Sequence, residues 1–320
     1  MTTADRLPPL WLGQSVRTTL VVDRYPALAA LPFMASLGDA IHRPRLIDAV
    51  FREKLRARLK VTGPIMLDSG GFTLMMQANA SLHAANLAAI YQTCGADLVV
   101  ALDEPATGND PIDEQRRKHK VTLDNLVILA DAIDHGRLVP VIHGPEFSDI
   151  ERNAEASAKI VTAPRLVALG GLVPTLRHSA YRPEQVFRKL VSAVSAVKAA
   201  FPTSAVHILG AGAPRTLTYA FRAGASSVDS IGWRRAAGFG TIFLADSAER
   251  FVEDRDRARP RSRLTLTKDD HDLLAQCTCP PCREAGEVDA RITVLASHYM
   301  PRAAHNAWTL HTQATRLCDE

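Results

Sequence analysis

Short apolar runs recur along the chain, and they constrain its fold more than any other feature. Each run has the length of a buried strand, reaches Gly, Asp or His near its end, and is followed by sequence with helical character. They lie at residues 30–37, 63–71, 96–105, 137–144, 165–172, 205–212, 226–232 and 240–246. Continuous apolar strands separated by helices indicate a parallel sheet covered on both faces.

The number of these runs favours a closed α/β barrel, the (β/α)8 or TIM barrel, over an open sheet. The segments 81–95 and 183–201 have the periodicity of amphipathic helices, which such a barrel places between its strands. A doubly wound open sheet is the alternative, because it also alternates strands with helices. We predict the barrel.

The composition is that of a globular protein with a large core, since 47% of the 320 residues are hydrophobic and 22% are charged. No run approaches the roughly 18–20 apolar residues that span a bilayer, so no membrane partner is expected. The start, MTTADRLPPLWLG, lacks a basic region followed by an apolar stretch, which predicts a cytoplasmic protein without a secretion signal. Thiols stay reduced there, so clustered cysteines are expected to bind metal.

Three of the five cysteines, Cys277, Cys279 and Cys282, fall within the stretch AQCTCPPCREAG at 275–286. The C-x-C-x2-C spacing lets three thiolates share one tetrahedral zinc, which then needs one more nitrogen or sulfur donor. The downstream candidates are His298, His305, His311 and Cys318, of which His305 opens a helix-like segment. Four protein ligands leave no open position, so a structural zinc is predicted. A reduced loop without metal is the alternative.

Polar side chains stand at or just past the ends of four strand-like runs: Asp68, Asp103, His143 and Asp229. Barrel enzymes carry their chemistry at the C-terminal ends of the strands, although each residue alone also suits a turn or a helix cap. Two carboxylates facing one cavity, one ionised and one able to carry a proton, are the working parts of glycosyl transfer. Asp68 and Asp229 are the candidate pair.

The sequences around this pair leave simpler interpretations open. The glycines of LDSGGF at 67–72 permit a sharp turn and leave room for a flat ligand, but a plain loop also fits. In GASSVDSIGWRR at 224–235, Arg234 and Arg235 follow Asp229. Nearby cations keep a carboxylate ionised, as a nucleophile must be, but a structural ion pair is the alternative.

Arginines are concentrated in one segment of a chain whose net charge is only +4. They are Arg250, Arg255, Arg257, Arg259, Arg261 and Arg263. Such a strip suits contact with the phosphates of a nucleic acid, which sets affinity without reading sequence. Acidic residues interrupt it, so an ion-paired surface segment is the alternative.

In their order along the chain, several short motifs resemble those of the tRNA-guanine transglycosylase family. They are DSGGF at 68–72, ALDEP at 101–105, VIHG at 141–144, ALGGL at 168–172, GAGAPRTL at 210–217, SVDSIGWRR at 227–235, and CTCPPC at 277–282 with HN at 305–306. The resemblance covers nearly the whole chain. It implies a barrel core over 1–246, a zinc-binding insertion over 247–304, and a C-terminal helix over 305–320 that completes the barrel. The family's zinc histidine precedes an asparagine, which singles out His305 as the fourth ligand.

The resemblance further implies that a guanine in a polynucleotide is exchanged for a free 7-deazaguanine base. Asp229 matches the nucleophile that attacks C1′ to form a covalent intermediate, and Asp68 matches the acid/base that serves the departing and incoming bases. The implied substrate contacts are Asp103, His143, Ser69, Gly70, Gly170, Gly171 and Arg235. The target base must leave its stack, and the Asp103 carboxylate can select guanine by its Watson–Crick edge. Zinc then holds the subdomain that docks nucleic acid and takes no part in the chemistry.

The chain departs from the family's tRNA enzymes at three positions. It has His143 where glutamine is usual, Pro105 where bacterial enzymes that bind an aminomethyl base have cysteine, and Thr73 where glutamine follows DSGGF. These departures resemble the family's DNA-modifying branch, which inserts bases such as 7-cyano-7-deazaguanine, so DNA is slightly favoured over tRNA.

Two hypotheses from other classes stand beside the enzyme. One is a non-catalytic partner subunit with the same fold and zinc, against which the retention of Asp68, Asp103 and Asp229 argues. The other is a plain zinc-stabilised barrel that binds nucleic acid. The family often forms homodimers around the zinc region, so the resemblance makes a second copy of the chain, or partner proteins, candidate partners.

Overall fold

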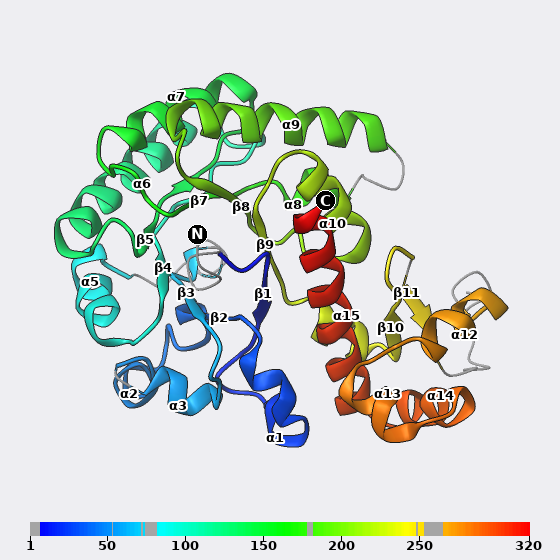
Figure 1. Cartoon of the computed structure of the whole chain (residues 1–320). Coiled ribbons are helices and arrows are strands. Elements are labelled where there is room, and N and C mark those ends of the chain that lie inside the picture. The colour runs from blue at the N-terminus through cyan, green and yellow to red at the C-terminus, as the bar shows by residue number, and fades with distance from the viewer. Residues whose placement is uncertain are drawn as a thin grey trace.

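The computed structural model describes residues 7–52, 54–71, 73, 82–177, 182–247, 249–252 and 265–320. Its parallel strands surround a central axis, with helices outside them (Figure 1). The barrel strands are β1 (Leu10–Gly13), β2 (Phe33–Ser36), β3 (Ile65–Asp68), β4 (Leu98–Val100), β5 (Leu138–Val139), β6 (Val141–Ile142), β7 (Leu166–Leu169), β8 (Ala205–Ile208) and β9 (Ser227–Ser230). They are hydrogen-bonded in the order β5-β4-β3-β2-β1-β9-β8-β7-β6.

Pro140 separates β5 from β6, which together act as one barrel strand. Proline has no N–H to donate to a ladder, but its carbonyl accepts from the backbone N–H of Ala168 at 2.9 Å. On one side β5 pairs with β4, and on the other β6 pairs with β7. The ring therefore closes with eight strand positions, and the predicted (β/α)8 barrel is confirmed.

One predicted strand was wrong, and another was missed. Residues 240–246 form β10 (Thr241–Phe243), which pairs antiparallel with β11 (Glu249–Phe251) in a separate two-stranded sheet. The eighth barrel strand is β1, which lies between β2 and β9. Its four residues, LWLG, follow two prolines and are too short to stand out as an apolar run. The run 240–246 was mistaken for a barrel strand because its Ile242 is buried in another place, the small core beside the cysteine cluster.

Helices cover the outside of the barrel. The longer ones next to it are α5 (Ala84–Thr93), α6 (Ile112–Ala132), α7 (Phe147–Ala158), α9 (Pro183–Ala200), α10 (Pro214–Arg222) and α15 (Tyr299–Asp319). Shorter elements are α1 (Val21–Arg24), α2 (Pro44–Leu46), α3 (Leu55–Leu59), α8 (Val173–Arg177), α11 (Gly232–Gly238), and the turns η2 (Pro26–Ala30), η3 (Leu37–Asp39) and η4 (Ile47–Phe51). The helices expected within 81–95 and 183–201 are thus α5 and α9. In the described part of the chain, no helix is both long and apolar enough to cross a bilayer.

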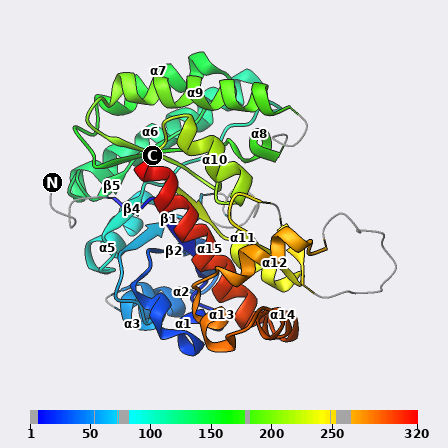
Figure 2. The same ribbon diagram turned by 45° about the vertical axis from the view of Figure 1, so that its right-hand side comes forward.

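The last part of the chain leaves the barrel and returns to it. After β11 come α12 (Lys268–Ala275), α13 (Pro280–Ala285) and α14 (Val288–Ser297), which project to one side, as Figure 2 shows. Helix α15 then packs against α1, α10, α11 and β1. It begins at Tyr299, so the predicted boundary at 304–305 falls inside this helix. The division into core, insertion and final helix remains a prediction.

Three hydrophobic clusters fill the molecule. The largest lies between the strands and the surrounding helices, the second fills the barrel interior around Trp11, Met34 and Met66, and the third lies beside the cysteine cluster. Neighbouring residues of a strand point to opposite faces. Because Val228 of β9 belongs to the outer layer, Ser227 and Asp229 face the barrel interior.

Candidate active site and metal centre

Asp68 is the last residue of β3 and lies opposite Ser36 of β2. The Ser36 hydroxyl donates to Asp68 Oδ2 at 2.7 Å, and the backbone N–H of Gly70 donates to the same oxygen at 3.1 Å. Burial raises the pKa of Asp68, the bond from Ser36 opposes that rise, and the negative charge of Asp229 adds to it. A raised pKa favours the protonated form of the carboxyl, which a general acid needs before it can donate.

The turn after Asp68 depends on glycine and on a buried serine. Gly70 has a φ of +83°, and a Cβ on it would come within 2.5 Å of the backbone nitrogen of Gly38. Only glycine meets both conditions without strain. Ser69 is completely buried, and its hydroxyl accepts from the Gly71 N–H at 3.4 Å, so it shapes the turn.

Asp103 follows β4 by three residues, and its side chain is 11% exposed. Burial raises its pKa to about 7, and the charge of Asp68 contributes to the rise. Gly71 makes room beside its carboxylate, because a Cβ on Gly71 would come within 2.4 Å of Asp103 Oδ1. Gly170 lies on the other side, where a Cβ would be 3.9 Å from Oδ2, an ordinary contact distance. The structure therefore brings Asp103, Asp68 and these backbones together at one site.

His143 directly follows β6 and is 2% exposed. Its Nε2 lies 3.9 Å from Asp103 Oδ2 and 3.5 Å from Thr122 Oγ1, whereas Nδ1 has no hydrogen-bond partner among the described residues. Burial lowers the pKa of His143 to about 4, and the charges of His119 and Lys118 add to the effect. The ring is neutral at pH 7, so one nitrogen donates while the other accepts. Gly171 has a φ of +75°, and a Cβ on it would lie 3.7 Å from Cβ of His143.

Asp229 lies on β9, and its side chain is 17% exposed. Its Oδ1 accepts from the backbone N–H of Gly210 at 2.6 Å and lies 3.3 Å from Nε2 of His207 on β8. Among the described residues it forms no ion pair with Arg234 or Arg235. Asp229 nevertheless interacts with Asp68, because the negative charge of Asp229 raises the pKa of Asp68.

The two arginines after Asp229 have different surroundings. Arg234 packs over the rings of Trp233 and Tyr299 and donates to the Tyr299 hydroxyl at 3.0 Å. Arg235, the residue expected to contact substrate, is exposed on α11. Arg234 thus has a structural role, and Arg235 is accessible to a ligand.

Sequence reasoning missed three contacts of the catalytic carboxylates: those from Ser36, His207 and the Gly210 N–H. Ser36 and Gly210 carry no chemical signal of their own. His207 does, because a histidine in the middle of the apolar run 205–212 has to find polar partners inside the core.

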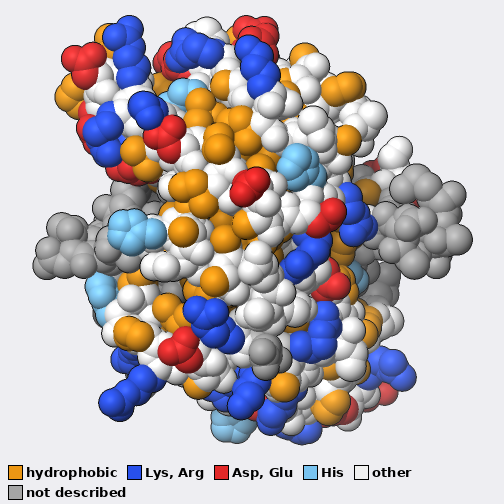
Figure 3. All heavy atoms as spheres, turned by 90° about the vertical axis from the view of Figure 1, so that its left-hand side faces the viewer, with side chains coloured by type: hydrophobic (Ala, Val, Ile, Leu, Met, Phe, Trp, Pro, Cys, Tyr) orange, Lys and Arg blue, Asp and Glu red, His pale blue; other side chains and the backbone are white. Residues whose placement is uncertain are grey.

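The expected arginine strip falls mostly outside the described residues, which include Arg250 but not Arg255, Arg257, Arg259, Arg261 or Arg263. Arg250 donates to Asp270 at 2.8 Å, in a largely buried ion pair. Figure 3 shows the face on the left of Figure 1, where basic and acidic side chains are interspersed with hydrophobic ones. On α6, Lys120 pairs with Asp124 at 2.6 Å. A lysine paired in this way offers less free positive charge to a phosphate at this position on α6.

The metal site combines three thiols with one imidazole. Nδ1 of His305 lies 3.5 Å from Sγ of Cys277, 3.4 Å from that of Cys279 and 3.6 Å from that of Cys282. A tetrahedral zinc with ordinary Zn–S and Zn–N bond lengths separates such atoms by about 3.6 Å. All four ligand atoms lie within 4.8 Å of one another. The donor set and its spacing therefore fit zinc.

Contacts around His305 orient it as a ligand. Its Nε2 lies 2.8 Å from the carbonyl oxygen of Phe243, which fixes the hydrogen on that nitrogen and leaves the Nδ1 lone pair for a metal. The next residue, Asn306, is buried; it accepts from the Phe243 N–H at 2.7 Å and donates to the carbonyl oxygen of Trp233 at 3.1 Å. These bonds join α15 to β10 and α11.

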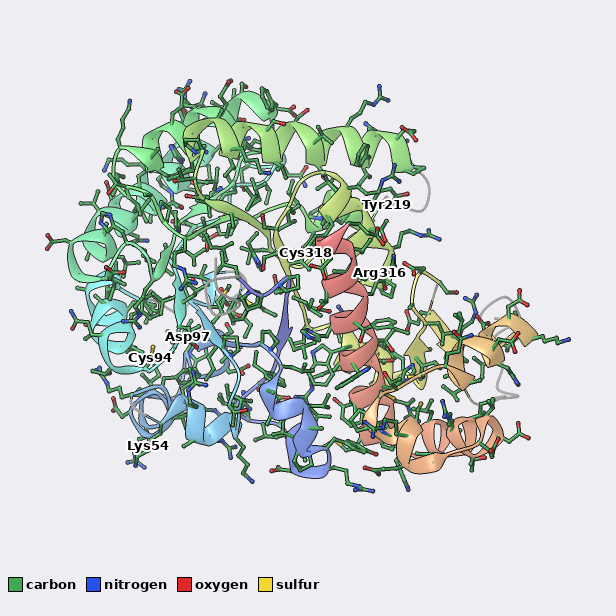
Figure 4. The ribbon with its side chains drawn as sticks, viewed as in Figure 1. Lys54, Cys94, Asp97, Tyr219, Arg316 and Cys318 are labelled. Carbon is green, nitrogen blue, oxygen red and sulfur yellow. The ribbon has the colours of Figure 1, made fainter. Side chains whose placement is uncertain are left out.

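The other proposed fourth ligands lie elsewhere. The cluster of potential metal ligands contains His305 but not His298, His311 or Cys318. Figure 4 shows Cys318 near the C-terminal end of α15, whereas α13, which carries Cys282, packs near the other end. The fifth cysteine, Cys94, lies across the barrel beside Asp97 (Figure 4).

Comparisons with known proteins show which family the sequence matches. The model of the family described as queuine tRNA-ribosyltransferase matches residues 33–312. The tRNA-guanine(15) transglycosylase of Pyrococcus abyssi is 25% identical over 276 residues, which are 84% of this chain and 43% of that protein. The one from Methanosarcina acetivorans is 27% identical over 209 residues, 64% of this chain and 41% of that protein. The one from Methanopyrus kandleri is 24% identical over 266 residues, 83% and 52% of the two chains. The chain thus spans about half the length of these relatives, or less.

Proposed function

We propose that this chain, which belongs to the queuine tRNA-ribosyltransferase family, exchanges a guanine in a nucleic acid for a free 7-deazaguanine base. The observation that carries the proposal is the set of three coupled carboxyl groups at the strand ends. Asp68 feels the charge of Asp229, and Asp103 feels that of Asp68. Base exchange needs a nucleophile, a proton carrier and a base reader within one site, and these three residues can supply them.

In the first half of the reaction, Asp229 attacks C1′ of the target nucleoside as the glycosidic bond breaks. The bonding electrons go to the departing guanine, which takes a proton from Asp68. Ionised Asp103 accepts from the N1–H and N2–H of the guanine, and the neutral His143 ring donates to O6. In the second half, Asp68 removes a proton from the incoming base, which attacks C1′ and releases the Asp229 carboxylate. The raised pKa of Asp68 supports its role in both halves.

Backbone and surface groups complete the proposed substrate site. The turn at Ser69 and Gly70 and the backbone of Gly170 and Gly171 are proposed to leave space for a flat base, and the close approach of Gly71 to Asp103 supports this. The exposed Arg235 is proposed to contact the phosphate backbone.

Zinc is the metal proposed for the four-ligand site. Cys277, Cys279, Cys282 and His305 would complete its coordination, so its role is structural. Through these four ligands, a bound zinc would join the cysteine cluster at 277–282 to α15. A cytoplasmic location and a homodimer around this region remain predictions.

The proposed polymer is DNA, with tRNA as the second candidate. His143, Pro105 and Thr73 favour DNA because they resemble the DNA-modifying branch. The names of the relatives, which are tRNA-guanine(15) transglycosylases, favour tRNA. Because the chain spans about half of those relatives or less, their names do not settle the polymer for this chain.

Incorporation of labelled base tests both parts of the proposal. The zinc-loaded protein is incubated with labelled guanine and either duplex DNA or bulk tRNA, and label in the polymer is counted. We expect label in DNA, and none with Asp229→Asn. Asp131→Asn is the matched control, because it removes an exposed carboxylate in the last turn of α6, the end of that helix that leads into the start of β5. Label in tRNA alone would overturn the choice of DNA, and label in neither polymer would contradict the transglycosylase proposal.

A further inference from the structure

The two oxygens of Asp229 have different environments. Both of its hydrogen bonds go to Oδ1, one from the Gly210 N–H at 2.6 Å and one with His207 Nε2 at 3.3 Å. Among the described residues, Oδ2 has no hydrogen-bond partner. A carboxylate held through one oxygen has a fixed orientation, and its other oxygen is left to react.

His207 is itself held by a chain of buried polar groups. Its Nδ1 lies 3.0 Å from the hydroxyl oxygen of Ser227 on the neighbouring strand. That hydroxyl accepts from the indole N–H of Trp11 at 3.0 Å and lies 2.9 Å from the carbonyl oxygen of Pro8. Its single hydrogen can go either to Pro8 or to Nδ1 of His207, and in the second case the hydrogen of a neutral His207 ring is on Nε2, facing Asp229. The ring of His207 is therefore fixed from the side opposite Asp229.

Burial removes the alternatives to this arrangement. His207 and Ser227 are both completely buried in the barrel interior, and Trp11 is 1% exposed. A histidine in such a place cannot turn towards water, and among the described residues its Nε2 has Asp229 as its one hydrogen-bond partner. Three strands, β1, β8 and β9, contribute to the chain of groups, which makes its geometry a property of the closed barrel.

We propose that His207 is a positioning residue for Asp229: together with the Gly210 N–H it holds Oδ1, so that Oδ2 is the oxygen that attacks C1′. This assignment rests on the function proposed above, in which Asp229 is the nucleophile. His207 does not touch the substrate and acts only through Asp229.

The assignment has a consequence for each half of the reaction. In the first, the Oδ2–C1′ bond forms while the bond from C1′ to the base breaks, and Oδ1 becomes the carbonyl oxygen of the ester. In the second, the incoming base bonds to C1′ and the Oδ2–C1′ electron pair returns to the carboxylate. Hydrogen bonds to Oδ1 are stronger when the group is charged, so they favour departure of the carboxylate. Without His207, the covalent intermediate should break down more slowly.

Two amide substitutions separate the bond to Asp229 from the bond to Ser227. The side-chain nitrogen of glutamine is as many bonds from Cβ as Nε2 of histidine, so His207→Gln can still donate to Asp229. The nitrogen of asparagine is as many bonds from Cβ as Nδ1, so His207→Asn can reach Ser227 but not Asp229. The two variants place the same polar group in the same buried site and form a matched pair.

The first readout is steady-state exchange of labelled guanine, with the melting temperature of each variant measured alongside. For His207→Asn we expect kcat to fall by about 100-fold, with an unchanged KM for the polymer, because the nucleophile loses its orientation. For His207→Gln we expect kcat within about tenfold of wild type. Wild-type kcat in His207→Asn, or an equal loss in both variants, would overturn the assignment.

The second readout is the covalent protein–polymer adduct, trapped by denaturation at a set concentration of free guanine. In His207→Asn the adduct fraction should rise by about tenfold relative to wild type. Without the bond from His207, the free Asp229 carboxylate is less stable relative to its ester with C1′, so more of the protein stays in the adduct. A purely structural role for His207 predicts an adduct that falls in step with kcat, and that result would refute the proposal.

A third readout does not depend on activity. In ¹⁵N NMR spectra, Nε2 of His207 should carry a hydrogen, and its shift should change in Asp229→Asn; no change would refute the contact. Failure of the proposed function looks different, because wild type would then exchange no base at all. Exchange that is lost in Asp229→Asn but unaffected in His207→Asn would overturn this inference alone.

Discussion

The buried carboxylate of Asp103, which is proposed to read the base, should lower the free energy of unfolding, and Asp103→Asn measures by how much. Burial raises the pKa of Asp103 to about 7, against 3.8 for an unperturbed aspartate. Between these two pH values, the folded chain keeps a proton on Asp103 that the unfolded chain has released. Stability therefore falls as pH rises through this window, and the whole cost is present above pH 7.

The size of the effect follows from the width of that window. At about 1.4 kcal/mol per pH unit, the gap between 3.8 and about 7 amounts to about 4 kcal/mol in the free energy of unfolding. Asparagine has the shape of the protonated carboxyl and cannot ionise. We expect Asp103→Asn to exceed wild type by about 4 kcal/mol at pH 8 and by only about 1.6 kcal/mol at pH 5. Base exchange should be lost at both.

Urea unfolding at pH 5 and pH 8 measures these differences, and thermal unfolding should show a rise of about 6 °C at pH 8 for a chain of this length. Asp113→Asn is the control, because the Asp113 side chain is 96% exposed. Its difference from wild type should be the same at both pH values. If Asp103→Asn is no more stable than wild type at pH 8, or if its advantage does not grow with pH, the reasoning about buried carboxylates at this site is refuted.

Three further outcomes are expected. At pH 5 the unfolded chain binds a proton on His143, but the folded chain, with a pKa of about 4, does not, so wild type loses stability between pH 8 and pH 5. Glutamine cannot titrate, so the free energy of unfolding of His143→Gln, compared with that of wild type in urea, should be about 2 kcal/mol higher at pH 5 than at pH 8. Metal analysis should find about one zinc per chain, and Cys279→Ser should lower both zinc content and melting temperature; a metal-free, well-folded protein contradicts this. Gly70→Ala should cost about 2 kcal/mol more than Gly95→Ala, since both have positive φ but only Gly70 lies against another backbone.

The fold was largely predictable because barrel strands are marked by their own residues. Runs buried on both faces are continuously apolar, and seven of the eight expected runs are barrel strands. The exception, 240–246, shows the limit of the signal, because Ile242 is as buried beside the cysteine cluster as it would be in a barrel. The missed strand at Leu10–Gly13 shows the opposite limit, since four residues are too few for a pattern.

The metal ligands were also within reach of the sequence, because three of them lie within six residues. The fourth needed more than local spacing, and the resemblance pointed to His305, which the structure brings to the three thiols. The acidic residues at the strand ends were identified for a similar reason: closure of a parallel barrel brings all those ends to one side.

Contacts between strands were decided only by the tertiary structure. The bond from Ser36 to Asp68 spans 32 residues, that between His207 and Asp229 spans 22, and that from Trp11 to Ser227 spans 216. Each depends on strand register, which no local pattern encodes. The raised pKa of Asp103 and the lowered pKa of His143 likewise arise from burial beside other charges. Residue types and their order thus identify the chemical groups. Closure of the barrel decides which of these groups meet, that Oδ1 of Asp229 is the hydrogen-bonded oxygen, and that the pKa of Asp103 is raised.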